Sequence, residues 1–373
     1  MIGAAPNEQQ RQPTMNKIRL AFLGVGDVAQ RDYLPELHRL GERVELAAVC
    51  GRTPERTRAV AEQYHAGAWF TDYAAMLAEA EIDAVINLTP IQMHTATTLR
   101  ALEAGKHVYT EKPAAGSVSE ARRLQTAAQQ HGRKLVCAPC VMLFPQVRYA
   151  QTLLAEKALG EIYLARAVIH MGVPPWSGYT SDPSPFFAKG GGPAVDMGVY
   201  PLHALTGLLG PVRRVSAMSS RTRSSFVPVD GPMAGQTVPV EVDDNWQMTL
   251  DLGEARLATL DANNCAQTTH APTLEIFGLA GTLALNLLDV SAPVKVQPAG
   301  GDWTEVALPR TGRAAGPDHL LGIEHLVDCI EHDRAPVLSI EHALHVVEII
   351  EQAERSAHTG QVWPIASRLG NDT

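Results

Sequence analysis

Residues 18–29 read IRLAFLGVGDVA, an apolar run that ends in a glycine-rich turn. The run predicts a buried strand, and the residues after it predict a helix over 28–40 that is interrupted at Pro35. Gly24 permits a tight turn, Gly26 lets backbone N–H groups approach a phosphate, and Ala29 lets strand and helix pack closely. The stretch therefore predicts a dinucleotide-binding loop made of Gly24, Val25, Gly26, Asp27 and Val28, although alone it also fits an ordinary turn.

The region from 17 to 140 alternates strands with helices, and this context strengthens the dinucleotide interpretation. Strands are expected at 18–23, 44–50, 68–70, 84–88, 107–110 and 135–138. Helices are expected between them at 54–64, 73–80, 94–104 and 119–131. Such alternation is typical of a doubly wound parallel sheet, so we predict a Rossmann domain over 17–140 after a disordered tail at 1–16.

The pattern changes after residue 140, where strands follow strands. A helix at 146–157 precedes expected strands at 162–170, 212–219, 245–252, 255–262, 273–277, 282–287 and 293–297. Two helices, at 317–332 and 340–357, close the chain. We therefore predict an α+β domain over 141–373 that is built on a mostly antiparallel sheet.

Composition excludes several classes of protein. The 373 residues carry a net charge of −9 without a basic stripe, which argues against nucleic acid as a partner. No apolar run is long enough for a membrane span, and the first 16 residues lack a signal-peptide pattern, so a cytoplasmic location is expected.

One pair of cysteines, Cys137 and Cys140, has the spacing of a redox dithiol or half a metal site. No second pair and no histidine cluster accompanies it. Two small buried residues at the end of a strand are the simpler interpretation, and we expect no metal.

Two groups of residues are candidates for chemistry. Glu111 and Lys112 follow the fifth expected strand, where ligands of parallel sheets bind, and the lysine ammonium would stabilise charge on a substrate oxygen. Asp196, Tyr200 and His203 share one face of an expected helix over 196–209, as a proton-transfer set would. The alternatives are a surface lysine before a helix, and an amphipathic helix that Asp196 caps and in which Tyr200 packs.

These motifs together resemble the Gfo/Idh/MocA family of NAD(P)-dependent oxidoreductases from about 17 to 365. The resemblance rests on GVGDVA at 24–29, TP at 89–90 with His94, AGKHVYTEKP at 104–113 and GGGPAVDMGVY at 190–200. It implies that the second domain has a large open sheet and binds substrate, with the active site between the two domains. It also implies a dimer or tetramer formed through the open face of that sheet. It further implies that the cofactor is surrounded by Gly24, Gly26, Thr89, Pro90, Glu111 and Lys112, with His94 flanking the nicotinamide.

The resemblance also implies that Lys112 and Asp196 work with the residue four positions after the aspartate. The commoner pattern has histidine there and aspartate or asparagine three further on, whereas this chain has Tyr200 and His203. Tyrosine occurs there in branches that resemble glucose–fructose oxidoreductases and dihydrodiol or xylose dehydrogenases. A phenol has an ordinary pKa near 10, so Lys112 would have to lower the pKa of Tyr200. His203 would orient a partner or simply pack.

The end of the second strand bears on the choice of cofactor. An NAD-selective site offers a carboxylate there, but this chain has Gly51 followed by Arg52. A guanidinium suits a 2′-phosphate, so NADP is the preferred expectation and NAD the alternative. A solvent-facing arginine at a helix start is the other interpretation of Arg52.

Aromatic residues precede Asp196 on a loop. Trp176 and Tyr179, with Phe186 and Phe187, would either stack on sugar rings or anchor the loop to the core. His342, His345 and Glu348 have helical spacing but lie far along the chain from the other motifs, so a metal site there is not expected.

These features predict hydride transfer between NAD(P) and a secondary alcohol or hemiacetal carbon of a sugar, polyol or related diol. Lys112 would polarise the reacting oxygen, Tyr200 would exchange its proton, and Asp196 would orient both. Two alternatives stay open: a glycosidase or lyase that uses tightly bound NAD transiently, and a non-catalytic regulator that binds the cofactor.

Overall fold

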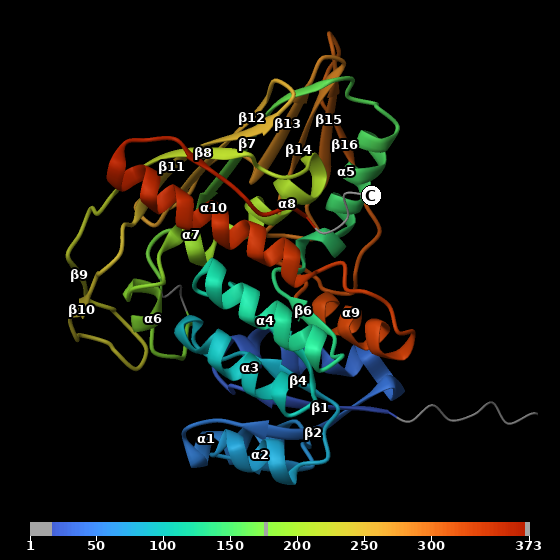
Figure 1. Cartoon of the computed structure of the whole chain (residues 1–373), viewed down its shortest axis with the longest axis vertical. Coiled ribbons are helices and arrows are strands. Elements are labelled where there is room, and N and C mark those ends of the chain that lie inside the picture. Colours follow the sequence, from blue (N-terminus) through green and yellow to red (C-terminus); the bar gives the residue numbers. More distant parts are fainter. Residues whose placement is uncertain (1–16, 175–177, 370–373) are drawn as a thin grey trace, which may run out of the picture.

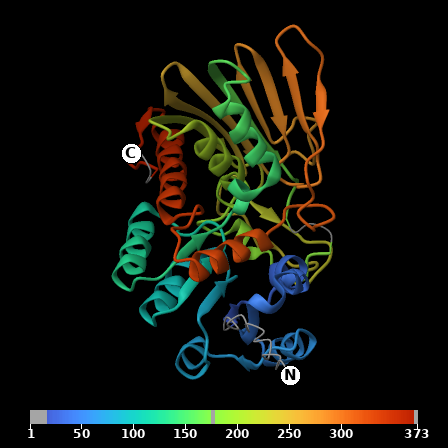
Figure 2. The same cartoon turned by 90° about the vertical axis from the view of Figure 1, so that its right-hand side faces the viewer.

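The computed structural model of the chain describes residues 17–174 and 178–369. The tail expected at 1–16 and the substrate candidate Trp176 therefore lie outside the described residues. Two sheets occupy opposite ends of the molecule, and the long C-terminal helix lies between them (Figures 1 and 2).

The first sheet confirms the predicted Rossmann domain. Its six strands are all parallel and run in the order β3-β2-β1-β4-β5-β6, in which the chain reverses direction across the sheet between β1 and β4. The strands are β1 (Ile18–Leu23), β2 (Val44–Cys50), β3 (Ala68–Phe70), β4 (Ala84–Asn87), β5 (His107–Thr110) and β6 (Leu135–Cys137). Almost every residue of these strands other than those of β3 is apolar and buried, as a sheet covered on both faces requires.

Helices of this domain lie close to their predicted places. They are α1 (Pro54–Gln63), α2 (Tyr73–Glu79), α3 (His94–Glu103) and α4 (Val118–Gln130). The Ser117 hydroxyl accepts a hydrogen bond from the Glu120 N–H at 3.3 Å and so caps α4.

The prediction of a regular helix over 28–40 is wrong in its geometry. The chain instead forms a wide π-helical turn, η1 (Ala29–Tyr33), and then a tighter 3₁₀ segment, η2 (Leu34–Arg43), in which Gly41 breaks the helix with φ = 54°. Pro35 has no N–H to continue an α-helical ladder, so the winding must change where it enters.

The second sheet has nine strands in the order β16-β15-β14-β13-β7-β12-β11-β8-β17. Only β7 and β12 are parallel, which confirms a mostly antiparallel sheet. The strands are β7 (Ile162–His170), β8 (Arg214–Ser220), β11 (Asn245–Gly253), β12 (Arg256–Asn263), β13 (Leu274–Gly278), β14 (Gly281–Leu285), β15 (Val294–Pro298), β16 (Thr304–Val306) and β17 (Trp363–Pro364). The short strands β16 and β17 were not predicted.

Helices α5 (Pro145–Ala155), α8 (Val199–Leu209) and α10 (Ile340–Thr359) pack against this sheet. The other face of the sheet carries exposed side chains such as Met218 on β8 and Leu257 on β12. Helix α10 also contacts α4, and α9 (Leu320–Glu331) packs on β5 and β6 (Figure 1). The two C-terminal helices thus join both halves of the molecule.

The helix predicted over 196–209 is divided in two. A short helix, α7 (Pro193–Asp196), ends at Asp196, and α8 begins three residues later at Val199. A Cβ at Gly198 would lie 2.6 Å from the Ala194 oxygen, so only glycine fits this bend. Asp196 therefore does not continue the helical face that Tyr200 and His203 share.

The segment from 224 to 244 contains a two-stranded ribbon of β9 (Ser225–Phe226) and β10 (Val238–Pro239). Val238 and Val240 pack with Phe187 from α6 (Ser184–Phe187) in a small apolar cluster. The remaining short turns are η3 (Ile91–Met93) and η4 (Cys140–Leu143).

Cys137 and Cys140 are buried free thiols, and burial raises the pKa of both. The Cys140 thiol lies 3.2 Å from the Asp318 carbonyl oxygen. Thiols kept protonated in an apolar setting are poor nucleophiles and metal ligands, which favours the simpler interpretation of this pair. Among the described residues, no helix has the length and apolar character needed to cross a membrane.

Candidate active site

One cavity of about 840 Å³ receives residues from both halves of the chain. Its first wall consists of the segments that follow β1, β2, β4 and β5, at the carboxyl ends of the parallel strands. The second wall comes from the segments around 179–186, 196–200 and 313–319. All eleven cofactor candidates line it: Gly24, Val25, Gly26, Asp27, Val28, Arg52, Thr89, Pro90, His94, Glu111 and Lys112.

The glycine loop approaches the neighbouring strand very closely. Gly24 has φ = +97°, and a Cβ there would lie 2.5 Å from the Leu88 oxygen. Its N–H donates to the Cys50 oxygen at 2.9 Å, which ties the loop to the end of β2. The loop therefore has the turn and the bare backbone that a pyrophosphate needs.

The end of β2 has no room for a carboxylate. A Cβ at Gly51 would lie 2.6 Å from both the Thr57 Oγ1 and the Val25 Cγ2 atoms. Arg52 and Arg56 line the cavity beside this point. This end of the cavity therefore carries two cationic side chains.

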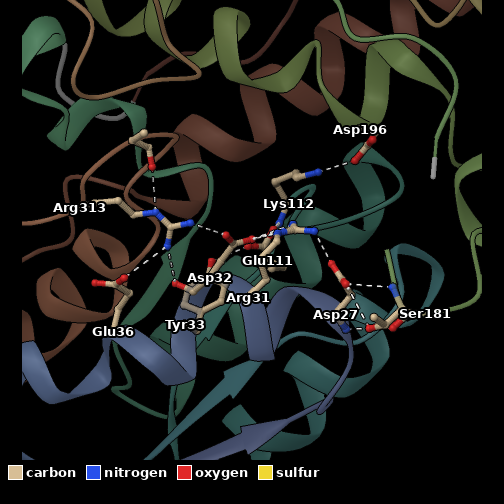
Figure 3. A network of polar contacts seen from close by, with 12 residues as sticks. Asp27, Arg31, Asp32, Tyr33, Glu36, Glu111, Lys112, Ser181, Asp196 and Arg313 are labelled. Atoms are coloured by element: carbon tan, nitrogen blue, oxygen red, sulfur yellow. Dashed lines mark hydrogen bonds and ion pairs between the residues drawn. The ribbon is translucent and has the colours of Figure 1, made fainter. Parts of the chain in front are cut away.

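A segment of the second half lies directly on the glycine loop (Figure 3). The Asp27 N–H donates to the Ser181 Oγ at 2.9 Å, and the Asp27 carboxylate accepts from the Thr180 N–H at 3.0 Å. Arg31 forms an ion pair with the other oxygen of the Asp27 carboxylate. Asp27, only 6% exposed, thus joins the two halves across the nucleotide end of the cavity.

His94 links the segments that follow β4 and β5. Its Nε2 lies 2.7 Å from the Thr89 oxygen, and its Nδ1 lies 2.8 Å from the Pro113 oxygen. Burial lowers the pKa of His94, although both carbonyls oppose this. The ring fixes the loop that carries Thr89 and Pro90 to the loop that carries Lys112, in addition to lining the cavity.

Lys112 and Asp196 form the central ion pair of the cavity (Figure 3). The two side chains are only 13% and 6% exposed, and the Lys112 ammonium also lies 5.7 Å from the centre of the Tyr200 ring. Lys112 follows β5 and Asp196 ends α7, so residues 84 positions apart meet here. The structure brings together the three predicted catalytic residues.

Glu111 contacts the backbone of Lys112 next to this ion pair. Its carboxylate accepts hydrogen bonds from the Lys112 N–H at 2.9 Å and from the Tyr33 hydroxyl. Burial alone would raise the pKa of Glu111, but Lys112, His319 and the Tyr33 hydroxyl together lower it. Glu111 therefore stays ionised inside the protein.

Tyr200 does not have the lowered pKa that base catalysis was expected to need. Burial raises the pKa of Tyr200 well above 10, and the charges of Glu111, Asp196 and Asp32 raise it further. The Lys112 ammonium, which lies 5.7 Å from the centre of the Tyr200 ring, is itself paired with Asp196. The phenol therefore keeps its proton at neutral pH, and its role in proton exchange with a substrate stays a prediction.

Several cavity residues were missed by the sequence analysis. Asp32 forms ion pairs with Arg31 and Arg313, both at 2.8 Å. Burial alone would raise the pKa of Asp32, but His319 and the two arginines together lower it. His319 lines the cavity from the segment before α9. The positions of Arg31 and Asp32, one turn beyond the glycine loop, could have indicated that they line the cavity. No sequence pattern indicated this for Arg313 or His319.

His203 is not a cavity residue. Its Nδ1 lies 2.8 Å from the Val199 oxygen, and its ring centre lies 4.8 Å from that of His342. Burial lowers the pKa of His203 to about 4. His203 therefore packs between α8 and α10, the second of the two roles considered for it.

The residues set aside as a metal site have structural partners. His345 accepts a hydrogen bond from the Val212 N–H at 3.0 Å, and Glu348 accepts from the Ser367 N–H at 2.8 Å.

The aromatic residues of the loop before Asp196 have different positions. Tyr179 and Phe186 line the cavity, with ring centres 5.7 Å apart, whereas Phe187 stacks on Phe226 outside it.

Comparison with known proteins agrees with this geometry. The profile described as "Oxidoreductase family, NAD-binding Rossmann fold" matches residues 18–138, and the GFO/IDH/MocA C-terminal domain matches residues 147–284. The fold and the site thus define an oxidoreductase with a dinucleotide-binding Rossmann domain. The chain belongs to the Gfo/Idh/MocA family.

Two relatives and one structure illustrate the similarity. The chain is 27% identical to the uncharacterized oxidoreductase ORF334 of Rhizobium meliloti, over 93% of this chain and 98% of that protein. It is 33% identical to D-glucoside 3-dehydrogenase of Escherichia coli (strain K12), over 55% of this chain and 58% of that protein. Levoglucosan dehydrogenase, in complex with NADH and L-sorbose, shares the fold with a TM-score of 0.83 and 19% identity, over 95% of this chain and all of that one.

Proposed function

We propose that this protein transfers a hydride between NADP or NAD and a secondary alcohol or hemiacetal carbon of a neutral sugar, polyol or related diol. The observation that carries the proposal is the buried pair of Lys112 and Asp196 beside Tyr200, in the cavity that also contains the glycine loop. Relatives named as a glucoside 3-dehydrogenase and a levoglucosan dehydrogenase support the sugar class.

The residues present fit a nicotinamide dinucleotide. Gly24 and Gly26 would admit the pyrophosphate, Thr89 and Pro90 would border the nicotinamide side, and Arg52 would bind a 2′-phosphate. The crowding at Gly51 supports NADP over NAD, because no acidic side chain fits where a ribose-binding carboxylate would stand.

The nicotinamide, when bound, supplies the hydride chemistry, and the protein supplies charge and orientation. The Lys112 ammonium would stabilise negative charge on the reacting oxygen. Asp196 would hold that ammonium in place, as their ion pair does now. Tyr200 would exchange a proton with the reacting oxygen, and its phenol is protonated at rest because burial raises its pKa well above 10.

The charge balance at this end of the cavity favours a neutral substrate. Lys112 is paired with Asp196, and Arg31 is paired with Asp27 and Asp32. Arg313 is 15% exposed at its side chain and directs its guanidinium to Asp32 and to the Ala315 carbonyl. A sugar acid or sugar phosphate would have to displace one of these carboxylates, and leaving a buried charge unpaired costs roughly 3–5 kcal/mol.

The test is a screen of purified protein with NADP⁺ and NAD⁺ against neutral aldoses, polyols and glycosides, with the matching uronates as controls. Reduced nicotinamide is followed by its absorbance. We expect stoichiometric NADPH release with at least one neutral substrate and much weaker turnover of its uronate. Turnover of a glycoside without net NAD(P)H release would support the glycosidase or lyase alternative. Saturable cofactor binding with no chemistry would support the regulator.

We further propose that the protein is a homodimer or homotetramer in the cytoplasm. Leu257 on β12, Leu164 on β7 and Phe277 on β13 are paired across the strands in one row on the open face of the second sheet. Leu257 is 48% exposed, and the other two are half-buried. Such a row supports a contact between copies, and light scattering tests it directly.

A further inference from the structure

A segment of the second half of the chain lies along the nucleotide end of the cavity. Its residues 179–182 line the cavity next to the glycine loop. A little further along, the Pro185 and Lys189 carbonyl oxygens accept hydrogen bonds from the Gln92 side-chain amide, at 3.1 and 3.4 Å. Gln92 belongs to η3, which follows β4. The segment is therefore attached to the first half at two places, one after β1 and the other after β4.

Asp27 holds this segment at the glycine loop (Figure 3). Because Asp27 adjoins Gly26, its carboxylate would repel a phosphate unless its charge were balanced. One carboxylate oxygen accepts the Thr180 N–H at 3.0 Å and the Thr180 hydroxyl at 3.2 Å, and the other pairs with Arg31. Both oxygens are thus occupied, and the carboxylate fixes Thr180, and with it the next residue, Ser181, beside the loop.

The Ser181 hydroxyl lies against the bare backbone of the glycine loop. Its oxygen accepts the Asp27 N–H at 2.9 Å, and a Cβ at Gly26 would lie 3.2 Å from the same oxygen. Among residues 17–174 and 178–369, none accepts the proton of this hydroxyl. A hydroxyl that accepts one hydrogen bond is polarised to donate another, and an anionic oxygen is a strong acceptor for it. Ser181 therefore offers a donor to a phosphate at this point of the cavity.

We propose that Ser181 is a ligand of the cofactor pyrophosphate, supplied by the second half of the chain. This inference rests on the proposed function, since it requires a dinucleotide in the cavity. Ser181 keeps the hydrogen bond that it accepts from the Asp27 N–H and donates its own proton to a pyrophosphate oxygen. The glycine loop supplies backbone N–H groups to the same pyrophosphate. Both halves of the chain thus bind one group of the cofactor, and release of the cofactor requires the Ser181 hydrogen bond to break.

The experiment measures the binding of NADPH, NADH and ADP-ribose to wild type, Ser181→Ala and Ser184→Ala. Nicotinamide fluorescence follows the two cofactors, and displacement of the reduced cofactor follows ADP-ribose. Ser184→Ala is the matched control, because Ser184 belongs to the same segment but is not among the described residues that line the cavity. We expect Ser181→Ala to bind all three ligands about 10-fold more weakly, because each contains a pyrophosphate. Ser184→Ala should stay within twofold of wild type.

A second readout locates the lost contact on the cofactor. Bound NADPH has ³¹P resonances from its pyrophosphate and a separate one from its 2′-phosphate. The pyrophosphate resonances should differ between wild type and Ser181→Ala, whereas the 2′-phosphate resonance should not. The spectrum of Ser184→Ala should match that of wild type. Neither readout depends on turnover.

Affinities of Ser181→Ala within twofold of wild type for all three ligands would overturn the inference. A loss confined to NADPH, a loss that Ser184→Ala shares, or unchanged pyrophosphate resonances would overturn it as well. A wild-type protein that binds none of the three ligands would instead remove the proposed function, and the inference with it.

Discussion

The two ends of the cavity are built in different ways. The nucleotide end is made of short segments that directly follow strands, such as Gly24 and Gly26 after β1 and Arg52 after β2. The catalytic end is made of side chains from positions as distant as Asp32, Lys112, Asp196 and His319, held by buried ion pairs. The nucleotide end should therefore respond to changes of backbone shape, and the catalytic end to changes of single charges.

The largest effect is expected at the catalytic end. Lys112→Met should lower turnover about 10³-fold while cofactor affinity stays within a few-fold, because the charge on the reacting oxygen loses its counterion. Steady-state rates and nicotinamide fluorescence measure the two quantities. The double variant Lys112→Met/Asp196→Asn is the control for the unpaired buried carboxylate. Turnover near the wild-type value would show that Lys112 is not part of the chemistry.

The next effect is expected at the glycine loop. Gly24→Ala places a Cβ against the Leu88 oxygen at a residue with φ = +97°, so cofactor affinity should fall about 100-fold or more. Gly41→Ala is the control, because Gly41 also has a positive φ but has no atom within 4 Å of the added Cβ. Equal cofactor affinity in both variants would contradict the close approach described here.

Arg52 gives a smaller and more selective change. Arg52→Ala should weaken NADPH binding about 10- to 100-fold and NADH binding less than twofold, since only the first carries a 2′-phosphate. Arg58→Ala, which removes an exposed arginine of α1 paired with Glu62, is the control. Equal losses for the two cofactors would remove Arg52 from the selection of NADP.

His203 should have the smallest effect on catalysis, because it lies outside the cavity. Its pKa is lowered from 6.5 to about 4 by burial, so the unfolded chain binds a proton between these values and the folded chain does not. Its contribution to stability is complete above pH 6.5 and is lost as the pH falls toward 4, by roughly 3 kcal/mol. His203→Leu should flatten the acid side of a stability curve from urea unfolding, with turnover unchanged. An unchanged curve would place the proton-linked stability elsewhere.

The nucleotide end was largely predictable from sequence because its chemistry lies in short local patterns. A strand that ends at Leu23, the glycines at 24 and 26, and Lys112 after β5 are each visible over a few residues. The parallel order of the first sheet followed from the alternation of strands and helices. Helical spacing was a weaker guide, since the bend at Gly198 separates Asp196 from the face of Tyr200 and His203.

The catalytic end was only partly predictable because long-range packing determines it. Whether Tyr200 has a raised or lowered pKa depends on Glu111, Asp32 and burial, which no local pattern reveals. Arg313 and His319 reach the cavity because α9 packs on β5 and β6, with Gly322 against the ring of Tyr109. That contact joins segments more than 200 residues apart.

The most direct test of this account is a single-turnover experiment on purified, cofactor-stripped protein. Wild type and Lys112→Met are each saturated with NADP⁺, mixed with the neutral substrate from the screen, and followed by nicotinamide absorbance. The account predicts one equivalent of NADPH per site in wild type and a burst about 10³-fold slower in the variant, with equal NADP⁺ affinity. Equal bursts in both, or NADP⁺ binding that is lost together with Lys112, would contradict the division of the cavity into a backbone-built nucleotide end and a charge-built catalytic end.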